Sequence, residues 1–346
     1  IKDACLHPVA DAYDLTIRSY TSTSLSTTHD VGATPNKSDY SEGKSYPFYT
    51  DNPGLRLTRA FDGLCFTGKI HETIGRTIIS NSKTIGSLDA VIHHYGKLNR
   101  EKEGYKVQYY FKLAQEEAEK NPADKWTQFN FLQEALAAGQ WEVALKAAQA
   151  GMKSNTAVAP LVMYGAGLAL QKMGRHEEAV EYFDLLLKQN PKHALALLCK
   201  GSSCETLGNV NAARELMMKS IELQPGYVPG YGVLSELELR LNNFDAARKT
   251  ALDAIDVAPT ESALYDLLLK IELTRGNHQQ AAQDASRGLQ MCPTGGGGKW
   301  QRLIAVYLHQ TGETATARAM LELGLRTFPN DPDLMRLKGM MYSNSV

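Results

Sequence analysis

Apolar and polar positions follow two different patterns along the chain, and the change comes near residue 100. In the first part the two kinds of side chain alternate, as they do in strands that bury one face. The segments that alternate in this way are residues 12–20, 54–61, 65–74 and 87–96. Residues 97–121 instead place apolar side chains about one helical turn apart, which predicts a connecting helix over residues 101–124.

The first two of these segments are separated by residues 21–46, which are rich in Ser, Thr, Asp, Asn and Gly. Such a composition is typical of surface loops. A connection of 26 residues is longer than most, which predicts a functional lid or partial disorder. We therefore expect residues 1–100 to form a small α+β region with a mobile loop at 21–46.

The rest of the chain repeats with a period of about 34 residues. Each unit has Gly or Asn at one position, Ala five residues later and, in five of six units, Pro seventeen residues later. The Gly or Asn positions are Gly139, Gly174, Gly208, Asn242, Gly276 and Gly312, and the Ala positions are Ala144, Ala179, Ala213, Ala247, Ala281 and Ala317. The Pro positions are Pro191, Pro225, Pro259, Pro293 and Pro329, with Thr156 in the first unit.

This spacing predicts a helix, a turn and a second helix in every unit. Gly and Asn tolerate the left-handed conformation that ends a helix, Ala allows two helices to cross closely, and Pro ends the second helix. One such unit cannot bury its apolar face alone, so neighbouring units must stack. The four glycines at 295–298 fall between two units and predict a flexible spacer.

These motifs resemble the tetratricopeptide (TPR) repeat, and another helical-hairpin solenoid is the alternative. The resemblance implies a mainly α fold, a TPR-type α-solenoid of about six helical hairpins over residues 125–331. Residues 332–346 begin one more first helix, which caps the stack or belongs to a truncated seventh repeat.

The first helices of such a solenoid line its concave groove, and the register assigns side chains to it. The groove residues are Trp126, Phe129, Gln133, Tyr164, Leu168, Lys172, Glu205, Glu236, Arg240, Asp266, Lys270, Arg302 and His309. Their charges are mixed, and the Lys and Asn ladder by which chaperone-binding repeats clamp a peptide carboxylate does not recur. We therefore expect a protein or peptide partner of another kind, although an aromatic group at Trp126, Phe129 and Tyr164 could equally pack against the preceding region.

Composition narrows the possible partners and the compartment. The chain has 37 basic and 38 acidic residues among 346, so its net charge of -1 argues against general nucleic-acid binding. No apolar run reaches the length of a membrane span. The five cysteines show neither zinc-site nor disulfide spacing, which favours a reducing compartment and a cytoplasmic location.

A second resemblance covers roughly residues 10–122. Its motifs are Arg-Leu-Thr-Arg at 56–59, Ile-His-Glu at 70–72 and His-Tyr-Gly at 94–96, followed by a Lys- and Arg-rich helix and then TPR repeats. This order resembles the second half of a bacterial family 2 glycosyltransferase of GT-A type. The resemblance implies inverting transfer of a sugar from a nucleotide sugar to a protein or glycan acceptor.

The same resemblance gives roles to individual residues. It implies that Glu72 is the catalytic base on the acceptor side and that a divalent cation binds at His94, with His71 as the runner-up ligand. Imidazole ligands favour Mn²⁺ over Mg²⁺. Arg56 and Arg59 would contact phosphate or the lid. From the residues alone, Glu72 and His71 could equally be a partly exposed pair at a strand end.

The sequence departs from that family at one point. The nucleotide-binding half with its Asp-x-Asp metal motif does not precede residue 60, so a chain that begins at Ile1 is expected to be a fragment or processed chain, inactive alone. Two hypotheses follow. In the first, the chain is part of a TPR-containing glycosyltransferase whose repeats bind the acceptor, a partner or another copy. In the second, it is a TPR protein–protein interaction scaffold without catalysis.

Overall fold

The computed structural model describes part of the chain and divides it into two compact units. The described residues are 9–21, 34–36, 40, 46, 48–62, 64, 75–94, 101–152, 159–293 and 295–343. The N-terminal unit comprises residues 1–224 and the C-terminal unit residues 225–346. Each unit is considered by itself below.

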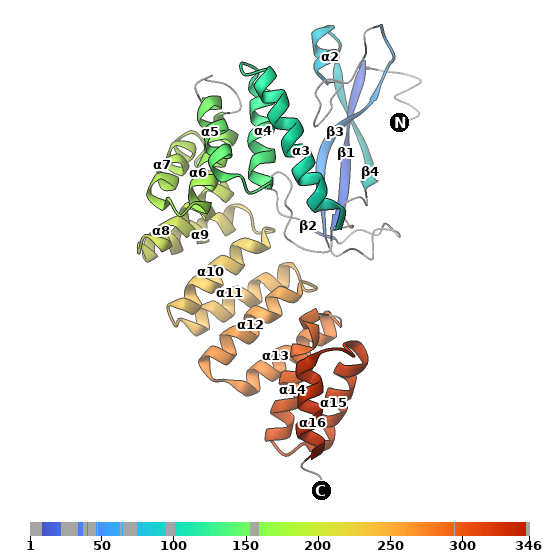
Figure 1. The fold of residues 1–346 in the computed structure, drawn as a ribbon, viewed down its shortest axis with the longest axis vertical. Helices are drawn as coiled ribbons and strands as arrows, with labels where there is room; N and C mark the ends of the chain where they lie inside the picture. The colour runs from blue at the N-terminus through green and yellow to red at the C-terminus, as the bar shows by residue number, and fades with distance from the viewer. Residues whose placement is uncertain are drawn as a thin grey trace. The chain divides into compact units, whose positions relative to one another are not determined.

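The N-terminal unit begins with a four-stranded mixed sheet (Figure 1). Its strands are β1 (Ala12–Thr21), β2 (Thr34–Pro35), β3 (Phe48–Thr58) and β4 (Ile85–His94), in the order β2-β3-β1-β4. The central strand β1 pairs antiparallel with β3 and parallel with β4. The short helix α2 (Gly75–Ser80) lies between β3 and β4 in the chain, and its Ile78 is buried beside Ala12.

The structure confirms three of the strands that the alternation predicts and changes the extent of one. The strand predicted at 54–61 begins at Phe48 instead, because β3 continues along β1 as far as the Thr21–Phe48 pair. Arg18 on β1 anchors this extension: its guanidinium donates to both carboxylate oxygens of Asp51, over 2.8 and 2.6 Å, and lies 3.9 Å from the centre of the Tyr49 ring. The segment 65–74 lies outside the described residues.

The expected mobile loop at 21–46 contains some regular structure. Thr34 and Pro35 pair with β3, and the Asn36 amide donates to the carbonyl of Tyr46 over 2.9 Å. This part of the segment is therefore attached to the sheet edge. Most of its other residues lie outside the described part of the chain.

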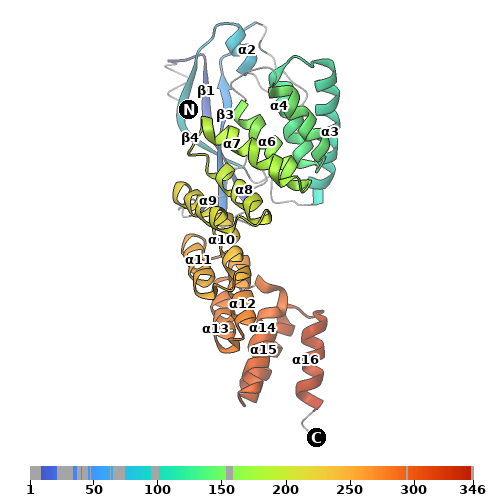
Figure 2. The same cartoon turned by 90° about the vertical axis from the view of Figure 1, so that its left-hand side faces the viewer.

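Helices account for most of the other residues that the structure describes (Figure 2). The N-terminal unit continues with α3 (Glu101–Lys120), α4 (Lys125–Ala137), α5 (Trp141–Met152), α6 (Ala159–Lys172), α7 (His176–Gln189), α8 (Ala194–Thr206) and α9 (Val210–Leu223). The C-terminal unit contains α10 (Val228–Arg240), α11 (Phe244–Val257), α12 (Ser262–Arg275), α13 (His278–Met291), the 3₁₀ turn η2 (Gly295–Gly298), α14 (Lys299–Gln310), α15 (Thr314–Thr327) and α16 (Pro332–Ser343).

The residues that define the sequence repeat hold these helical hairpins together. The repeated alanines at 144, 179, 213, 247, 281 and 317 are all fully buried. The turn glycines have positive φ angles, for example 75° at Gly174, and Asn242 takes the same conformation with φ 59°. A Cβ atom on Gly167 would lie 2.6 Å from the Phe183 ring, so a larger residue would separate the two helices of that hairpin. The helical-hairpin prediction is thus confirmed within each unit.

The glycine run between α13 and α14 is a packed turn rather than the expected flexible spacer. Gly296, Gly297 and Gly298 all have positive φ angles, and a Cβ atom on Gly296 would lie 2.5 Å from the Trp300 ring. Trp300 itself is fully buried. The run consists of glycine because the chain must turn in the left-handed region while touching an indole ring.

The helix predicted beyond residue 331 forms as α16. Leu334 and Met341 are buried in one cluster with Ala305, Ala317 and Leu321 of α14 and α15. The opposite face of α16 leaves Met335 and Met340 exposed. This helix therefore covers the apolar side of the last complete hairpin.

Candidate functional site

The C-terminal unit has an apolar cavity of about 490 Å³ between α12 and α14. Its apolar lining consists of Leu269, Leu273, Leu303 and Val306. Residues four apart on α12 and three apart on α14 face the same side of their helices, so each helix contributes one pair. Leu273 keeps 41% of its surface exposed, which makes this lining accessible to a partner.

Four charged residues surround that apolar lining. They are Asp266 and Lys270 of α12, and Lys299 and Arg302 of α14. Three of them, Asp266, Lys270 and Arg302, are groove residues that the repeat register predicts, and the structure brings these three to one cavity. Lys299 was missed, because the glycine insertion shifts the register just before it.

Trp300 fixes the spacing of the two helices that form the cavity. Its indole Nε1 donates to Oδ1 of Asp266 over 2.6 Å, and its ring meets Tyr265 edge-on at 6.0 Å between centroids. Lys299 Nζ donates to the other oxygen, Oδ2 of Asp266, over 2.5 Å. Both oxygens of Asp266 are therefore used to join α14 to α12.

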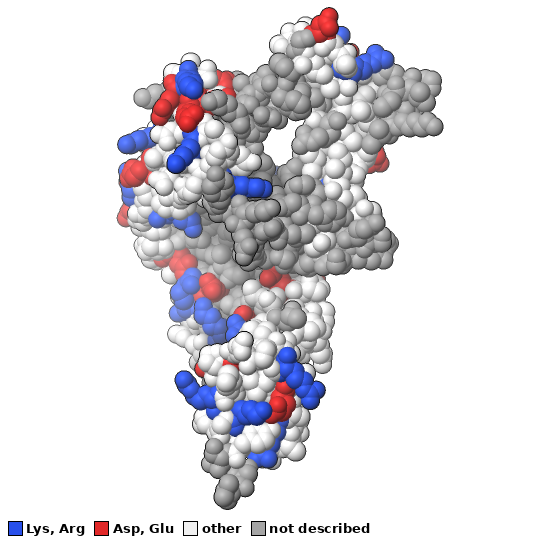
Figure 3. Space-filling model, turned by 45° about the vertical axis from the view of Figure 1, so that its right-hand side comes forward, with Lys and Arg blue, Asp and Glu red and all other residues white. Residues whose placement is uncertain are grey.

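Ion pairs connect the cations of the cavity to the neighbouring first helices. Lys270 Nζ lies 3.3 Å from Oε1 of Glu236 on α10, and Arg302 pairs with Asp333 on α16. Arg240 approaches the other oxygen of Glu236 at 3.9 Å. All these side chains are substantially exposed, so the pairs contribute little to stability. Basic and acidic side chains accordingly interleave on the face that Figure 3 shows.

The groove residues predicted in the N-terminal unit differ in their exposure. Tyr164 on α6 is only 7% exposed because it stacks on His193 at 5.5 Å and lies against Phe183. Burial also lowers the pKa of His193 below its ordinary value. Trp126 is exposed, and the Phe129 ring lies edge-on beside it. Of the three residues of the predicted aromatic group, Trp126 and Phe129 therefore pair with each other, whereas Tyr164 is buried.

Of the other predicted groove residues of this unit, Lys172 on α6 is exposed, whereas Gln133 on α4, Leu168 on α6 and Glu205 on α8 are half-buried. None of the four lines a described cavity, and their place in the groove stays a prediction.

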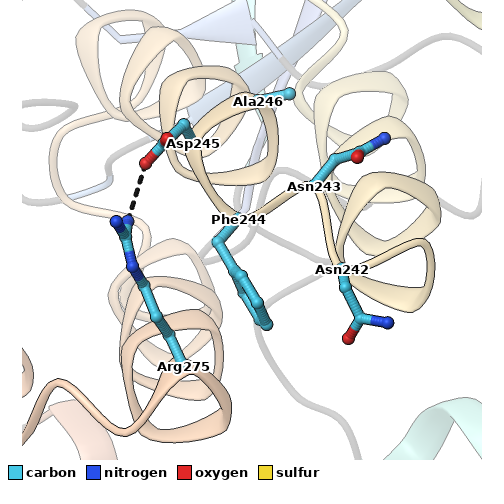
Figure 4. Close-up of a pocket in the computed structure, with 6 residues that line it drawn as sticks. All are labelled: Asn242, Asn243, Phe244, Asp245, Ala246 and Arg275. Carbon is cyan, nitrogen blue, oxygen red and sulfur yellow. Dashed lines mark hydrogen bonds and ion pairs between the residues drawn. The ribbon is translucent and has the colours of Figure 1, made fainter.

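A second cavity of about 410 Å³ lies at the turn edge of the C-terminal unit (Figure 4). It is lined by Asn242, Asn243, Phe244, Asp245 and Arg275 with Ala246, and Arg275 Nη1 donates to Asp245 Oδ1 over 2.6 Å. The sequence gives one signal for it, since this repeat has Asn242 where the other five have Gly.

A buried ionic cluster joins α11, α12 and α13, and the sequence analysis missed it. Arg248 donates to Asp284 over 2.5 and 3.0 Å and to Glu272 over 3.2 Å. The hydrogen bonds that Arg248 donates to Asp284, with the charges of Asp284 and Glu272, raise the pKa of Arg248 above its ordinary value. The signal is again a break in the repeat: four residues before the turn Gly or Asn, four units have Ala, Leu or Cys, whereas the other two have Glu238 and Glu272.

The structure tests little of the predicted catalytic site. Glu72 and His71 lie outside the described residues. Arg56 and His94 are placed only as backbone, in β3 and at the end of β4, whereas Arg59 is exposed and its backbone N–H donates to Asp11. Among the described residues no three His, Cys, Asp or Glu side chains form a group that could hold a metal. The base, the Mn²⁺ ligands and the phosphate contacts therefore stay predictions.

The neighbouring histidine of β4 belongs to an aromatic cluster. His93 Nδ1 lies 2.8 Å from the Tyr20 hydroxyl, and the His93 ring stacks between Tyr20 at 5.8 Å and Tyr40 at 3.7 Å.

Comparison with known proteins supports the repeats. The tetratricopeptide repeat family model matches residues 129–186, 164–228 and 234–296. The chain matches none of the curated proteins. The C-terminal part of a TPR repeat-containing protein from Cytophaga hutchinsonii is 15% identical, with a TM-score of 0.53 over 68% of this chain and 98% of that one. This likeness shows the fold.

Two other solved structures have lower TM-scores. A tetratricopeptide repeat protein from Parabacteroides merdae is 17% identical, with a TM-score of 0.46 over 69% of this chain and 96% of that one. MamA from Desulfovibrio magneticus is 22% identical, with a TM-score of 0.43 over 49% of this chain and 96% of that one.

The chain is thus mainly helical and carries TPR repeats, preceded by a small sheet. The comparisons give no support to the glycosyltransferase resemblance. Within the described part of the chain, no helix combines the length and the apolar character that crossing a membrane requires.

Proposed function

We propose that this TPR-bearing chain is a protein–protein interaction scaffold that binds a peptide segment of its partner between α12 and α14. The observation that supports this most is the open apolar cavity on the first helices of the C-terminal unit, where register-predicted residues meet. Leu273 is the best-placed contact, because a ligand that covers an exposed Leu side chain on a cavity wall removes apolar surface from water, which stabilises the complex.

A peptide-display experiment on the full chain tests this proposal. Peptides selected from a random library are measured for affinity to the native chain and to Leu273→Asp. Fully burying a Leu side chain contributes about 1.5–3 kcal/mol, of which covering the exposed 41% of Leu273 supplies a part. An unpaired Asp carboxylate in the apolar lining adds a desolvation cost, so the substitution is expected to weaken binding about tenfold. Leu185→Asp on α7 is the matched control, because Leu185 is similarly exposed at 47% but does not line the cavity.

Two outcomes contradict the proposal. One is a library that yields no peptide with saturable binding to the folded chain. The other is a set of peptides that bind Leu273→Asp as tightly as the native chain. Unchanged circular dichroism of both variants shows that the comparison is made between folded proteins.

Sugar transfer is the competing hypothesis, and it rests on the resemblance of residues 10–122 alone. It requires a nucleotide sugar and a divalent cation, with Mn²⁺ preferred. The scaffold proposal expects no change in thermal unfolding when nucleotide sugars and Mn²⁺ are added. A saturable stabilisation by a nucleotide sugar, together with sugar transfer that Glu72→Gln abolishes without removing the stabilisation, would favour the transferase instead.

A further inference from the structure

The α12–α14 cavity is lined by more cations than carboxylates. Three cations, Lys270, Lys299 and Arg302, and one carboxylate, Asp266, line it, and the carboxylates that pair with Lys270 and Arg302 lie outside the lining. Both oxygens of Asp266 already accept hydrogen bonds, Oδ1 from Trp300 and Oδ2 from Lys299. A basic peptide would therefore meet three cations and one carboxylate that is already paired.

The other two cations can be released for a ligand at little cost. Glu236 and Asp333, which pair with Lys270 and Arg302, come from neighbouring helices and lie outside the cavity lining. Both pairs are half-exposed, so water and salt already compete with them. Glu236 would also keep Arg240 as a partner after Lys270 turned towards a ligand.

From this geometry we propose that the cavity selects an internal peptide segment in which an apolar side chain is flanked by Asp or Glu. The apolar side chain covers Leu273 and Leu303, and the flanking carboxylates accept hydrogen bonds from Lys270 and Arg302. The inference rests on the proposed function and specifies the chemistry of its partner. It concerns side-chain carboxylates within a segment, and the C-terminal carboxylate takes no part.

The test uses two peptide libraries with acetylated and amidated ends, so that no terminal charge is present. Both fix a central Leu. One varies the flanking positions among Asp, Glu, Gly and Ser, and the other among Lys, Arg, Gly and Ser. The acidic library is expected to give peptides that bind the full chain at least about tenfold more tightly than the basic one, with an advantage that falls as salt rises.

Charge-changing variants test which cations produce the preference for acidic peptides. Lys270→Glu and Arg302→Glu are expected to weaken the acidic peptides about tenfold, and the milder Lys270→Gln and Arg302→Gln about threefold to fivefold. Arg275→Glu is the control, because Arg275 is an exposed cation on α12 that lines the other cavity. Native circular dichroism and a native melting temperature are required of all five variants before their affinities are compared.

The outcomes separate this inference from the proposed function. Basic peptides that depend on Leu273, or acidic peptides indifferent to Lys270 and Arg302, would overturn the inference while leaving the scaffold intact. Absence of binding from both libraries, together with absence of binding from a fully random library, would overturn the proposed function as well.

Discussion

Replacing Arg248 with Met should be among the most damaging single changes in the C-terminal unit. The substitution removes the only cation in contact with two buried carboxylates, Glu272 at 1% and Asp284 at 5% side-chain exposure, among the described residues. It deletes three hydrogen bonds, and Oε2 of Glu272 already has no hydrogen-bond partner among the described residues. Two like charges would then share a largely buried site.

The magnitude follows from the burial of the cluster. Removing one partner of a fully buried ion pair costs about 3–5 kcal/mol. Arg248 retains 22% side-chain exposure, so water reaches one side of the cluster and the loss should be about 3 kcal/mol. Replacing all three residues by apolar ones of similar volume (Arg248→Met, Glu272→Met and Asp284→Leu) should recover most of this loss, because no unpaired charge remains.

Hydrogen exchange of the α12 amides, followed by mass spectrometry, reports the local opening free energy in the full chain. Arg275→Met is the control, since its exposed pair with Asp245 should contribute less than about 0.5 kcal/mol. A native rate of exchange in Arg248→Met would refute the reasoning. A triple variant no more protected than the single one would show that the cost comes from lost packing and not from buried charge.

Other predictions concern the turn and two titrating groups. Gly296→Ala should lower the free energy of unfolding, measured by urea denaturation, more than Gly297→Ala does. Both substitutions force Ala into positive φ, but of the two Cβ atoms only the one at 296 meets the Trp300 ring. Equal losses would contradict the packing argument. Burial raises the pKa of Cys292 from 9.0 to about 11, so the native chain should lose stability relative to Cys292→Ala as pH rises through this window, and parallel stability profiles would argue against it. Burial lowers the pKa of His193, so stability should fall as pH drops below about 6.5, and His193→Asn, which keeps an acceptor at the start of α8, should flatten that fall.

The helical hairpins could be predicted from sequence because their determinants are local and repeated. Each hairpin needs a small residue at one crossing, a left-handed turn and a break, and Ala247, Asn242 and Pro259 show this set within a single unit. The strands were predictable as segments, but the order β2-β3-β1-β4 depends on pairing between distant residues. Strand alternation alone does not contain that information.

The candidate site was predictable only in part. The register placed Asp266, Lys270 and Arg302 on one face, and the structure shows them around one cavity. It placed Tyr164 on the same kind of face, yet His193 from the next repeat covers that ring. Lys299 was not predicted, because the glycine insertion shifts the repeat register just before it. The repeat register predicts which face of its helix a side chain occupies, whereas the exposure of that side chain depends on residues of the neighbouring repeat.

Photo-crosslinking tests the central claim most directly. A peptide selected on the full chain carries a benzophenone at its apolar position, is irradiated in the complex, and the attached residues are mapped by mass spectrometry. Binding in the cavity predicts adducts within α12 and α14, at residues such as Leu273 and Leu303. Adducts confined to the N-terminal unit, or to α11, α13 and α15, would contradict it.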